Sequence, residues 1–246
     1  VRKKLVDAFG GRFEQVIVGG APLNAEVEAF LHRIKFPFTV GYGMTECGPL
    51  ISYTHHSEFI PRSSGRILEG YMQVKIDSSD PELIPGEICV RGENVMAGYY
   101  KNQEATEKVI DKDGWLHTGD MGTVNNDDTI FIKGRYKTMI LGASGQNIYP
   151  EEIESKLNNM PFIMESLVIE KDGRLVALVY PDYEAVDDYG IANEDLPVAM
   201  EEIRKNLNKE VAPYEQIAKI HLYPTEFEKT PKRSIKRYLY TNFSPI

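Results

Sequence analysis

The stretch that decides the fold reads WLHTGDMGTVNNDDTIFIKGRYK and covers residues 115–137. The Asn-Asn-Asp-Asp segment at residues 125–128 is typical of a hairpin turn, and the alternating residues 129–132 predict the returning strand. Because a hairpin brings its ends together, we expect the carboxylate of Asp120 to lie near the guanidinium of Arg135. An acceptor beside a five-donor cation suits the hydroxyls and phosphate of a nucleotide. An ordinary surface ion pair is the alternative.

Two loops of small residues precede this stretch, and each follows a predicted strand. Residues 15–18 predict a strand that runs into the first loop, and residues 38–40 predict one that runs into the second loop, residues 41–46. A predicted helix over residues 24–34 separates the strands. This order is typical of an α/β layer, in which ligands bind at the carboxyl ends of strands. The first loop consists of Gly19, Gly20, Ala21 and Pro22.

The second loop carries side chains suited to a nucleotide. Its glycines let the backbone approach a ligand, its tyrosine offers a ring face to a base, and its threonine offers a hydroxyl to a phosphate oxygen. Its glutamate offers a hard oxygen to Mg²⁺. A tight turn with a core tyrosine and a solvated glutamate is the alternative. The residues concerned are Gly41, Tyr42, Gly43, Thr45 and Glu46.

The rest of the chain predicts two further kinds of structure. Short alternating strands between residues 65 and 132 predict a small β-barrel or curled sheet. After Lys137 the pattern predicts a compact α+β unit, with helices over residues 150–159 and 194–210. Its strands are expected at residues 166–170 and 174–180, and a solvated acidic loop at residues 182–188.

The expected fold class is therefore α/β and α+β, in two domains. The first covers residues 1–136, with an α/β portion at 1–64 and a β-barrel-like portion at 65–136. The second is an α+β domain at residues 137–246.

The composition is that of a globular protein. Of the 246 residues 42% are hydrophobic and 26% charged, and the net charge of −9 speaks against nucleic acid or an anionic membrane as a partner. No apolar run approaches the roughly 18 residues that a membrane-spanning helix needs. We therefore expect no transmembrane segment and a cytoplasmic location.

Other reactive side chains have ordinary interpretations. Cys47 and Cys89 lie far apart with no CxxC motif, so we expect reduced thiols and neither a disulfide framework nor a metal cluster. His117 is expected to pack beside the Thr-Gly-Asp turn. Trp115 is expected in the core.

Several ordered motifs resemble those of the adenylate-forming enzymes, which comprise acyl-CoA synthetases, peptide-synthetase adenylation domains and beetle luciferases. The Ser/Thr/Gly-rich phosphate loop that this family carries earlier in its sequence does not occur here. The resemblance therefore implies the C-terminal half or less of such an enzyme. The motifs are residues 86–100 (GEICVRGENVMAGYY), 117–120 (HTGD), 134–154 (GRYKTMILGASGQNIYPEEIE) and 229–237 (KTPKRSIKR).

The resemblance implies binding of ATP or AMP, with Mg²⁺. Tyr42 would stack on adenine, Thr45 would touch the α-phosphate, and Glu46 would hold Mg²⁺. Asp120 would accept both ribose hydroxyls, and Arg135 would donate to ribose or phosphate. The nucleotide and acyl pocket would be lined by Gly19, Gly20, Ala21, Pro22, Gly41 and Gly43.

It also implies a mobile C-terminal domain that binds CoA as a substrate. Lys137 falls at the family's hinge position. A lysine there, with the sequence QNIYP at residues 146–150, resembles fatty acyl-CoA synthetases more than peptide-synthetase modules. The loop with Gly142, Ser144 and Gly145 would line the path of the pantetheine arm.

The tail departs from the family pattern Pro-Thr-Gly-Lys-Ile-x-Arg, because Ser234 stands where the lysine is expected. Serine cannot supply the charge-assisted hydrogen bond of that lysine. If the segment is extended, Lys232 and Lys236 share the face of Ser234 about 7 Å along the strand. Either lysine could then substitute. A solvated basic tail that touches the CoA phosphates is the alternative.

The function expected from the resemblance is that of an AMP-forming acyl-CoA ligase. It would activate a carboxylic acid, expected to be a fatty acid, to acyl-AMP and form a thioester with CoA; the isolated chain is expected to be inactive. An adenylation domain that loads a carrier protein is one alternative. A noncatalytic nucleotide-binding module, favoured by Ser234 and the missing phosphate loop, is the other.

Overall fold

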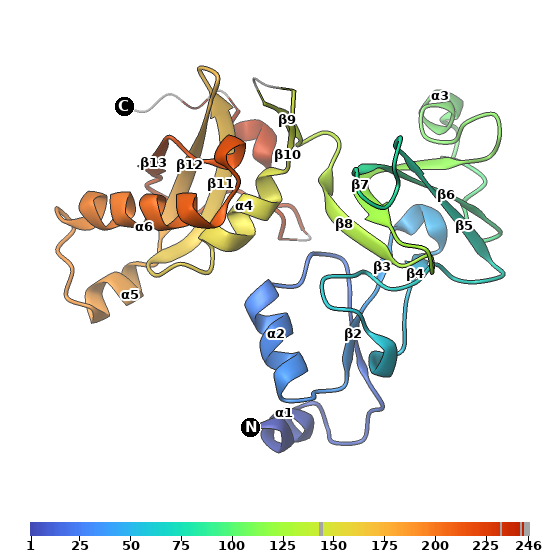
Figure 1. Ribbon diagram of the computed structural model, residues 1–246, viewed down its shortest axis with the longest axis horizontal. Coiled ribbons are helices and arrows are strands. Elements are labelled where there is room, and N and C mark those ends of the chain that lie inside the picture. The colour runs from blue at the N-terminus through green and yellow to red at the C-terminus, as the bar shows by residue number, and fades with distance from the viewer. Residues whose placement is uncertain (143–144, 232, 242, 244–246) are drawn as a thin grey trace. The chain divides into compact units, whose positions relative to one another are not determined.

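The computed structural model describes residues 1–142, 145–231, 233–241 and 243, which fall into two compact units, Val1–Lys137 and Thr138–Ile246 (Figure 1). Each unit has buried hydrophobic clusters of its own. Among the described residues, no helix has both the length and the apolar surface needed to cross a bilayer.

After a short helix at its start, the first unit has the strand–helix–strand order that the sequence predicts. β1 and β2 pair in parallel, with Val18 opposite Val40, so the loops that follow them start at the same edge. The side chain of Asn24 caps the helix between them by accepting two backbone N–H groups at 2.9 and 3.2 Å. The elements are α1 (Arg2–Ala8), β1 (Val16–Val18), α2 (Ala25–Arg33) and β2 (Phe38–Val40).

A short antiparallel pair begins inside the predicted second loop, whose residues 42–43 form its first strand. The backbone at Gly43 lies so close to the opposite strand that a Cβ atom would collide with the carbonyl oxygen of Pro49. Only glycine fits there. The elements are β3 (Tyr42–Gly43), the 3-10 helix η1 (Thr45–Cys47), β4 (Leu50–Ser52) and the 3-10 helix η2 (His56–Glu58).

Four longer strands complete the first unit as an open antiparallel sheet in the order β5-β6-β7-β8 (Figure 1). Of the β-barrel or curled sheet expected over residues 65–136, the barrel is wrong, because within this fully described range the outer strands do not pair with each other. The elements are β5 (Met72–Asp77), β6 (Gly86–Gly92), α3 (Gln103–Glu107), β7 (Leu116–Val124) and β8 (Ile130–Arg135).

The predicted hairpin is confirmed by β7 and β8. Its turn is closed by the side chain of Asn125, which accepts the N–H of Thr129 at 2.8 Å, and Asp128 takes a left-handed conformation with φ of 58°. Asp120 and Arg135 are direct partners in the strand register. The turn chemistry therefore fixes which residues meet at the open end of the hairpin.

The second unit is built on a three-stranded sheet in the order β11-β12-β13. The two helices expected around residues 150–159 and 194–210 are confirmed as α4 and α6, whereas the acidic segment at residues 182–188 forms α5 instead of a loop. Asp182 caps this helix by accepting the N–H of Ala185 at 3.1 Å. The elements are β9 (Ile140–Leu141), β10 (Asn147–Ile148), α4 (Pro150–Leu157), β11 (Ile163–Lys171), β12 (Arg174–Pro181), α5 (Tyr183–Asp188), α6 (Leu196–Glu210), η3 (Pro213–Glu215), β13 (Lys219–Leu222) and η4 (Arg237–Leu239).

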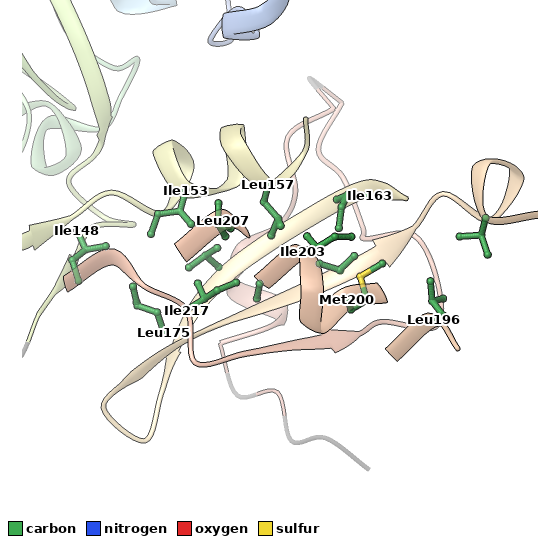
Figure 2. Packing of buried hydrophobic residues seen from close by; sticks show 14 residues of the cluster. Ile148, Ile153, Leu157, Ile163, Leu175, Leu196, Met200, Ile203, Leu207 and Ile217 are labelled. Carbon is green, nitrogen blue, oxygen red and sulfur yellow. The ribbon is translucent and has the colours of Figure 1, made fainter. Parts of the chain in front are cut away.

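Both faces of this sheet are buried. Successive residues of β12 point to opposite faces, so Leu175 belongs to the cluster that contains α4 and α6, whereas Val176 belongs to an aromatic cluster of the C-terminal segment. Figure 2 shows Ile153, Leu157, Ile203 and Leu207 from the two helices packed against the strands. The aromatic cluster includes Phe227 and Tyr240, with Tyr223 and Phe243 packed against it.

Candidate functional site

A carboxylate held from two sides lies where the hairpin meets the second loop. The hydroxyl of Tyr42 donates a hydrogen bond to Oδ2 of Asp120 at 2.7 Å. The Nε atom of Arg135 lies 3.2 Å from the other oxygen, Oδ1. The structure thus brings together three side chains that are up to 93 residues apart in the sequence, Tyr42 being buried and Arg135 exposed.

The turn before Asp120 is fixed by its own hydrogen bonds. The hydroxyl of Thr118 donates to the carbonyl of Ile88 at 2.8 Å and accepts the N–H of Asp120 at 3.1 Å. Gly119 has a left-handed φ of 71°, which glycine adopts without a steric cost. Arg135 also donates from Nη2 to the carbonyl of Thr118 at 3.2 Å. The carboxylate is therefore oriented by backbone contacts as well as by its two side-chain partners.

The environment keeps the phenol of Tyr42 protonated. Burial raises the pKa of Tyr42, and the charge of Asp120 raises the pKa further. Tyr42 therefore remains a hydrogen-bond donor at neutral pH. Its ring belongs to the buried cluster of the first unit.

Glu46 lies in η1 and has a separate set of contacts. Its carboxylate accepts the hydroxyl of Tyr99 at 2.9 Å, and this hydrogen bond raises the pKa of Tyr99. Thr45, next to Glu46, is exposed. A carboxylate beside an exposed hydroxyl fits Mg²⁺, which binds through one or two carboxylates and keeps waters and phosphate oxygens as its other ligands.

The first loop lies beside the start of the second. A Cβ atom at Gly19 would approach the carbonyl oxygen of Gly41 to 3.2 Å, and Gly20 has a φ of 86°. Gly19, Gly20, Ala21 and Pro22 are all exposed. The backbone of this loop is therefore open to a ligand at the carboxyl edge of β1 and β2.

The remaining predicted residues lie at the unit boundary and in the second unit. Lys137 is the last residue of the first unit and lies in an exposed turn. Between β9 and β10, Gly142 donates its N–H to the carbonyl of Gln146 and accepts that of Gly145, both at 2.8 Å. Ser144 lies outside the described residues.

The tail forms a tight hairpin. Lys229 bridges Ile235 in antiparallel fashion, and Arg233, at the glycine position of the family pattern, has a left-handed φ of 63°. The segment is thus not extended throughout, which removes the assumption that placed its lysines on one face. Lys236 pairs with Glu228 at 3.2 Å, while Lys232 lies outside the described residues.

Sequence reasoning missed the part that Glu87 plays at this site. Its Oε1 accepts the N–H of Gly119 at 3.0 Å, and its Oε2 lies 2.8 Å from Nδ1 of His117. Glu87 therefore anchors the turn that presents Asp120. The contact depends on the register of β6 and β7, for which the sequence carries no local signal.

Comparison with known proteins gives consistent matches. Residues 2–100 match a family model described as AMP-binding enzyme. The chain is 36% identical to 4-coumarate–CoA ligase 5 of Oryza sativa subsp. japonica, over 90% of the chain and 42% of the relative. It is 34% identical to 4-coumarate–CoA ligase 1 of Glycine max, over 89% of the chain and 76% of the relative.

Solved structures share the fold at lower identity. The o-succinylbenzoate CoA synthetase of Bacillus subtilis, solved with its acyl-adenylate intermediate, superimposes with a TM-score of 0.79 at 24% identity, over 98% of this chain and 50% of that one. The adenylation domain of a carboxylate reductase from Mycobacterium chelonae superimposes with a TM-score of 0.81 at 23% identity, over 97% of this chain and 39% of that one. The expected α/β and α+β fold class is confirmed by this likeness. The chain spans about half of these structures or less.

Proposed function

Because this chain belongs to the AMP-binding family of adenylate-forming enzymes, we propose that it takes part in the ATP-dependent activation of a carboxylic acid and its transfer to CoA. The chain spans 42% of the rice ligase, so the proposal concerns the complete protein in which this sequence occurs. The observation that carries it is the carboxylate of Asp120, oriented between Tyr42 and Arg135.

The proposed reaction has two steps. An oxygen of the substrate carboxylate attacks the α-phosphorus of ATP, pyrophosphate leaves, and acyl-AMP forms. The thiol of CoA then attacks the acyl carbonyl, loses its proton, and AMP leaves. Both steps gather negative charge around the nucleotide, so positioned hydrogen-bond donors and cations are the main aid that a protein can supply.

Asp120 and Arg135 are proposed to hold the ribose. A carboxylate offers about four acceptor positions on its two oxygens, and Tyr42 and Arg135 approach one oxygen each. Asp120 would accept the ribose hydroxyls in this fixed orientation. The exposed guanidinium of Arg135 would donate to the ribose or the phosphate.

The phosphates and the metal are assigned to the second loop. Thr45 would donate its hydroxyl to the α-phosphate, and Glu46 would hold Mg²⁺, which supplies charge neutralisation on the phosphate oxygens when it is bound. The exposed backbone of the first loop supports an adenine pocket at this edge, whereas the Tyr42 ring is buried in the core cluster, as in the alternative of a core tyrosine. The pocket would be lined by Gly19, Gly20, Ala21, Pro22, Gly41, Tyr42 and Gly43.

The second unit is proposed to act as a mobile lid. The boundary between the units falls directly after Lys137, which supports a hinge there, since a hinge needs a few residues outside regular elements. Gly142, Ser144 and Gly145 would line the path of CoA. Domain motion would let one lid serve both steps.

The positive charge expected at Ser234 has to come from elsewhere. Lys236 lies two residues after Ser234 in the sequence and pairs with the exposed Glu228, a partner that a phosphate could replace. We propose Lys236 as the substitute, with Lys232 as the second candidate. The noncatalytic nucleotide-binding module remains the second proposed function, favoured by Ser234 itself.

The relatives bear on which acid is activated. The relatives compared above are named for 4-coumarate, so the fatty-acid expectation gains nothing from them. We propose a hydrophobic carboxylic acid, with 4-coumarate and fatty acids as the two classes to compare.

Acid-dependent exchange of pyrophosphate into ATP tests the first step in the complete protein. We expect exchange with one of the two acid classes, and a fall of about 10²-fold in Asp120→Asn, because one positioned electrostatic contact is worth that much. Asp127→Asn, a carboxylate of the same hairpin in an exposed ion pair with Arg66, is the matched control and should keep full exchange.

Release of AMP with CoA or with a carrier protein as the thiol then separates the two catalytic alternatives. CoA-dependent release supports the proposal. Nucleotide binding without exchange for any acid would favour the noncatalytic module.

A further inference from the structure

A second cluster of reactive side chains lies on β6 and β7, apart from the residues assigned to the nucleotide. Glu87, Cys89 and His117 each offer one ligand atom, and these atoms all lie within 4.8 Å of one another. The Sγ atom of Cys89 is 3.6 Å from Nδ1 of His117, which is itself 2.8 Å from Oε2 of Glu87. The register of the two strands places them together, since Cys89 is opposite His117.

The distances suit a tetrahedral metal. With Zn–S near 2.3 Å and Zn–N near 2.0 Å, two tetrahedral ligand atoms lie about 3.5 Å apart, which is close to the separation of Cys89 from His117. The contact from His117 to Glu87 would have to widen by about half an ångström to reach the corresponding N–O separation. That movement is within the range of one side-chain adjustment.

The other ring nitrogen of His117 faces a carboxylate that lies just beyond hydrogen-bond distance. Its Nε2 atom lies 3.7 Å from Oδ2 of Asp111. In metal sites a carboxylate at the second nitrogen fixes the ring orientation and raises the basicity of the ligating one. Asp111 is itself held by the backbone N–H groups of Asp113 and Trp115, at 3.0 and 2.9 Å.

We propose that Glu87, Cys89 and His117 form a site for Zn²⁺, with Asp111 as the carboxylate that orients the histidine. A thiolate, an imidazole and a carboxylate are zinc ligands, whereas Mg²⁺ takes oxygen ligands only. Three protein ligands leave the fourth position to water. The side chain of His117 is 34% exposed and that of Glu87 23%, so the ion can enter from solvent although Cys89 is buried.

Zinc binding would displace a proton and would also affect the turn beside the nucleotide site. The thiol proton of Cys89 would leave to solvent as the Zn–S bond forms, and His117 would bind through Nδ1 as the neutral tautomer that keeps its proton on Nε2, facing Asp111. Glu87 would bind the metal through Oε2 while its Oε1 holds the N–H of Gly119. Occupancy would therefore pull on the turn that presents Asp120, whether or not the proposed function is correct.

Cobalt spectroscopy on the metal-free, reduced chain tests the proposal. We expect one equivalent of Co²⁺ to give a thiolate-to-cobalt charge-transfer band, and one equivalent of Zn²⁺ to abolish it. Cys89→Ser and His117→Asn should lose the band. Asp111→Asn should keep it but weaken the affinity 10- to 100-fold, as expected for a carboxylate outside the ligand set.

The chain carries its own matched controls. It has two cysteines, so Cys47→Ser, which removes the other buried thiol, should keep the band, and so should His56→Gln. Circular dichroism would show whether each variant folds, and His117→Asn serves if Cys89→Ser does not. Absence of the band in folded wild-type chain would overturn the site, as would a band that survives Cys89→Ser or disappears in Cys47→Ser.

Discussion

Two arginine–carboxylate pairs, one in each unit of this protein, differ in what surrounds them. In the first unit Arg135 is 58% exposed and meets Asp120 at the open end of a hairpin. In the second unit Arg237 is only 20% exposed and pairs through Nη2 with the buried Glu154. Arg135 therefore presents hydrogen-bond donors to solvent, whereas Arg237 stabilises the packing of the second unit.

The pair of Glu154 and Arg237, called the closed pair below, connects three segments of the second unit. Arg237 also donates to the carbonyl of Val168 on β11 at 3.3 Å and lies 3.5 Å from Glu151 on α4. The second oxygen of Glu154 accepts the N–H of Val168 at 2.6 Å. The C-terminal segment is fastened in this way to a helix and a strand.

The largest expected effect comes from breaking the closed pair. Arg237→Ala leaves the buried Glu154 without its counter-charge, so we expect a loss of about 3–5 kcal/mol in the free energy of unfolding of the second unit at pH 8. Hydrogen exchange of β11 and β12, followed by mass spectrometry in urea, measures it. Lys236→Ala, which removes the neighbouring exposed ion pair with Glu228, should cost less than about 1 kcal/mol. Equal losses would contradict the comparison.

The pH dependence of stability is a second test of the buried pair of Glu154 and Arg237. Burial raises the pKa of Glu154 to about 7, although Arg237 opposes the shift. Because the folded pKa lies above the unfolded value, the stabilisation is complete below about pH 4.5 and is lost as the pH rises through 7. At about 1.4 kcal/mol per pKa unit the loss is on the order of 3 kcal/mol.

Glu154→Gln isolates this contribution. The stability of the wild type relative to this variant should fall between pH 5 and 8 in urea titrations. A difference that stays constant with pH would show that Glu154 remains ionised throughout.

The contrast also shows what the sequence could predict. Asp120 and Arg135 meet because a local turn signal fixes the register of one hairpin, and such signals are visible in a single sequence. Glu154 and Arg237 are separated by 83 residues, and only the packing of the C-terminal segment brings them together. Nothing local to either residue indicates the other.

Errors in the sequence prediction have similar causes. The barrel was one of two forms expected from the short strands with alternating residues, but closure depends on strand number and pairing, which are properties of the whole sheet. Trp115 was expected in the core, yet its ring is partly exposed between Lys75 and Arg91, whose charged groups lie 4.5 and 4.7 Å from the ring centre. A single aromatic residue does not reveal that its neighbours across two strands are cations.

A smaller effect is expected from Tyr42→Phe, which removes the donor on the buried side of Asp120. A hydrogen bond to a charged group contributes about 1.5–3 kcal/mol, and we expect a loss near the lower end because Arg135 remains. Urea unfolding of the first unit can be followed by the fluorescence of Trp115, the single tryptophan. Tyr71→Phe, at an exposed ring, is the control and should change nothing. An unchanged free energy of unfolding in Tyr42→Phe would mean that the turn backbone alone orients Asp120.

The smallest effect on stability, and the sharpest separation of the two pairs, is expected from Arg135→Ala. An ion pair with an exposed arginine contributes less than about 1 kcal/mol, so the Trp115 transition should move little. Affinity for ATP, measured by calorimetry in the complete protein, should nevertheless fall about 10-fold, because a charge-assisted contact to the nucleotide is lost. Arg66→Ala removes another arginine ion pair of the same unit, with Asp127, in which the two side chains are 43% and 46% exposed. It should also change the stability by less than about 1 kcal/mol, without the loss of affinity. If both variants bound ATP equally well, the pair of Arg135 and Asp120 would be an ordinary surface ion pair with no part in nucleotide binding.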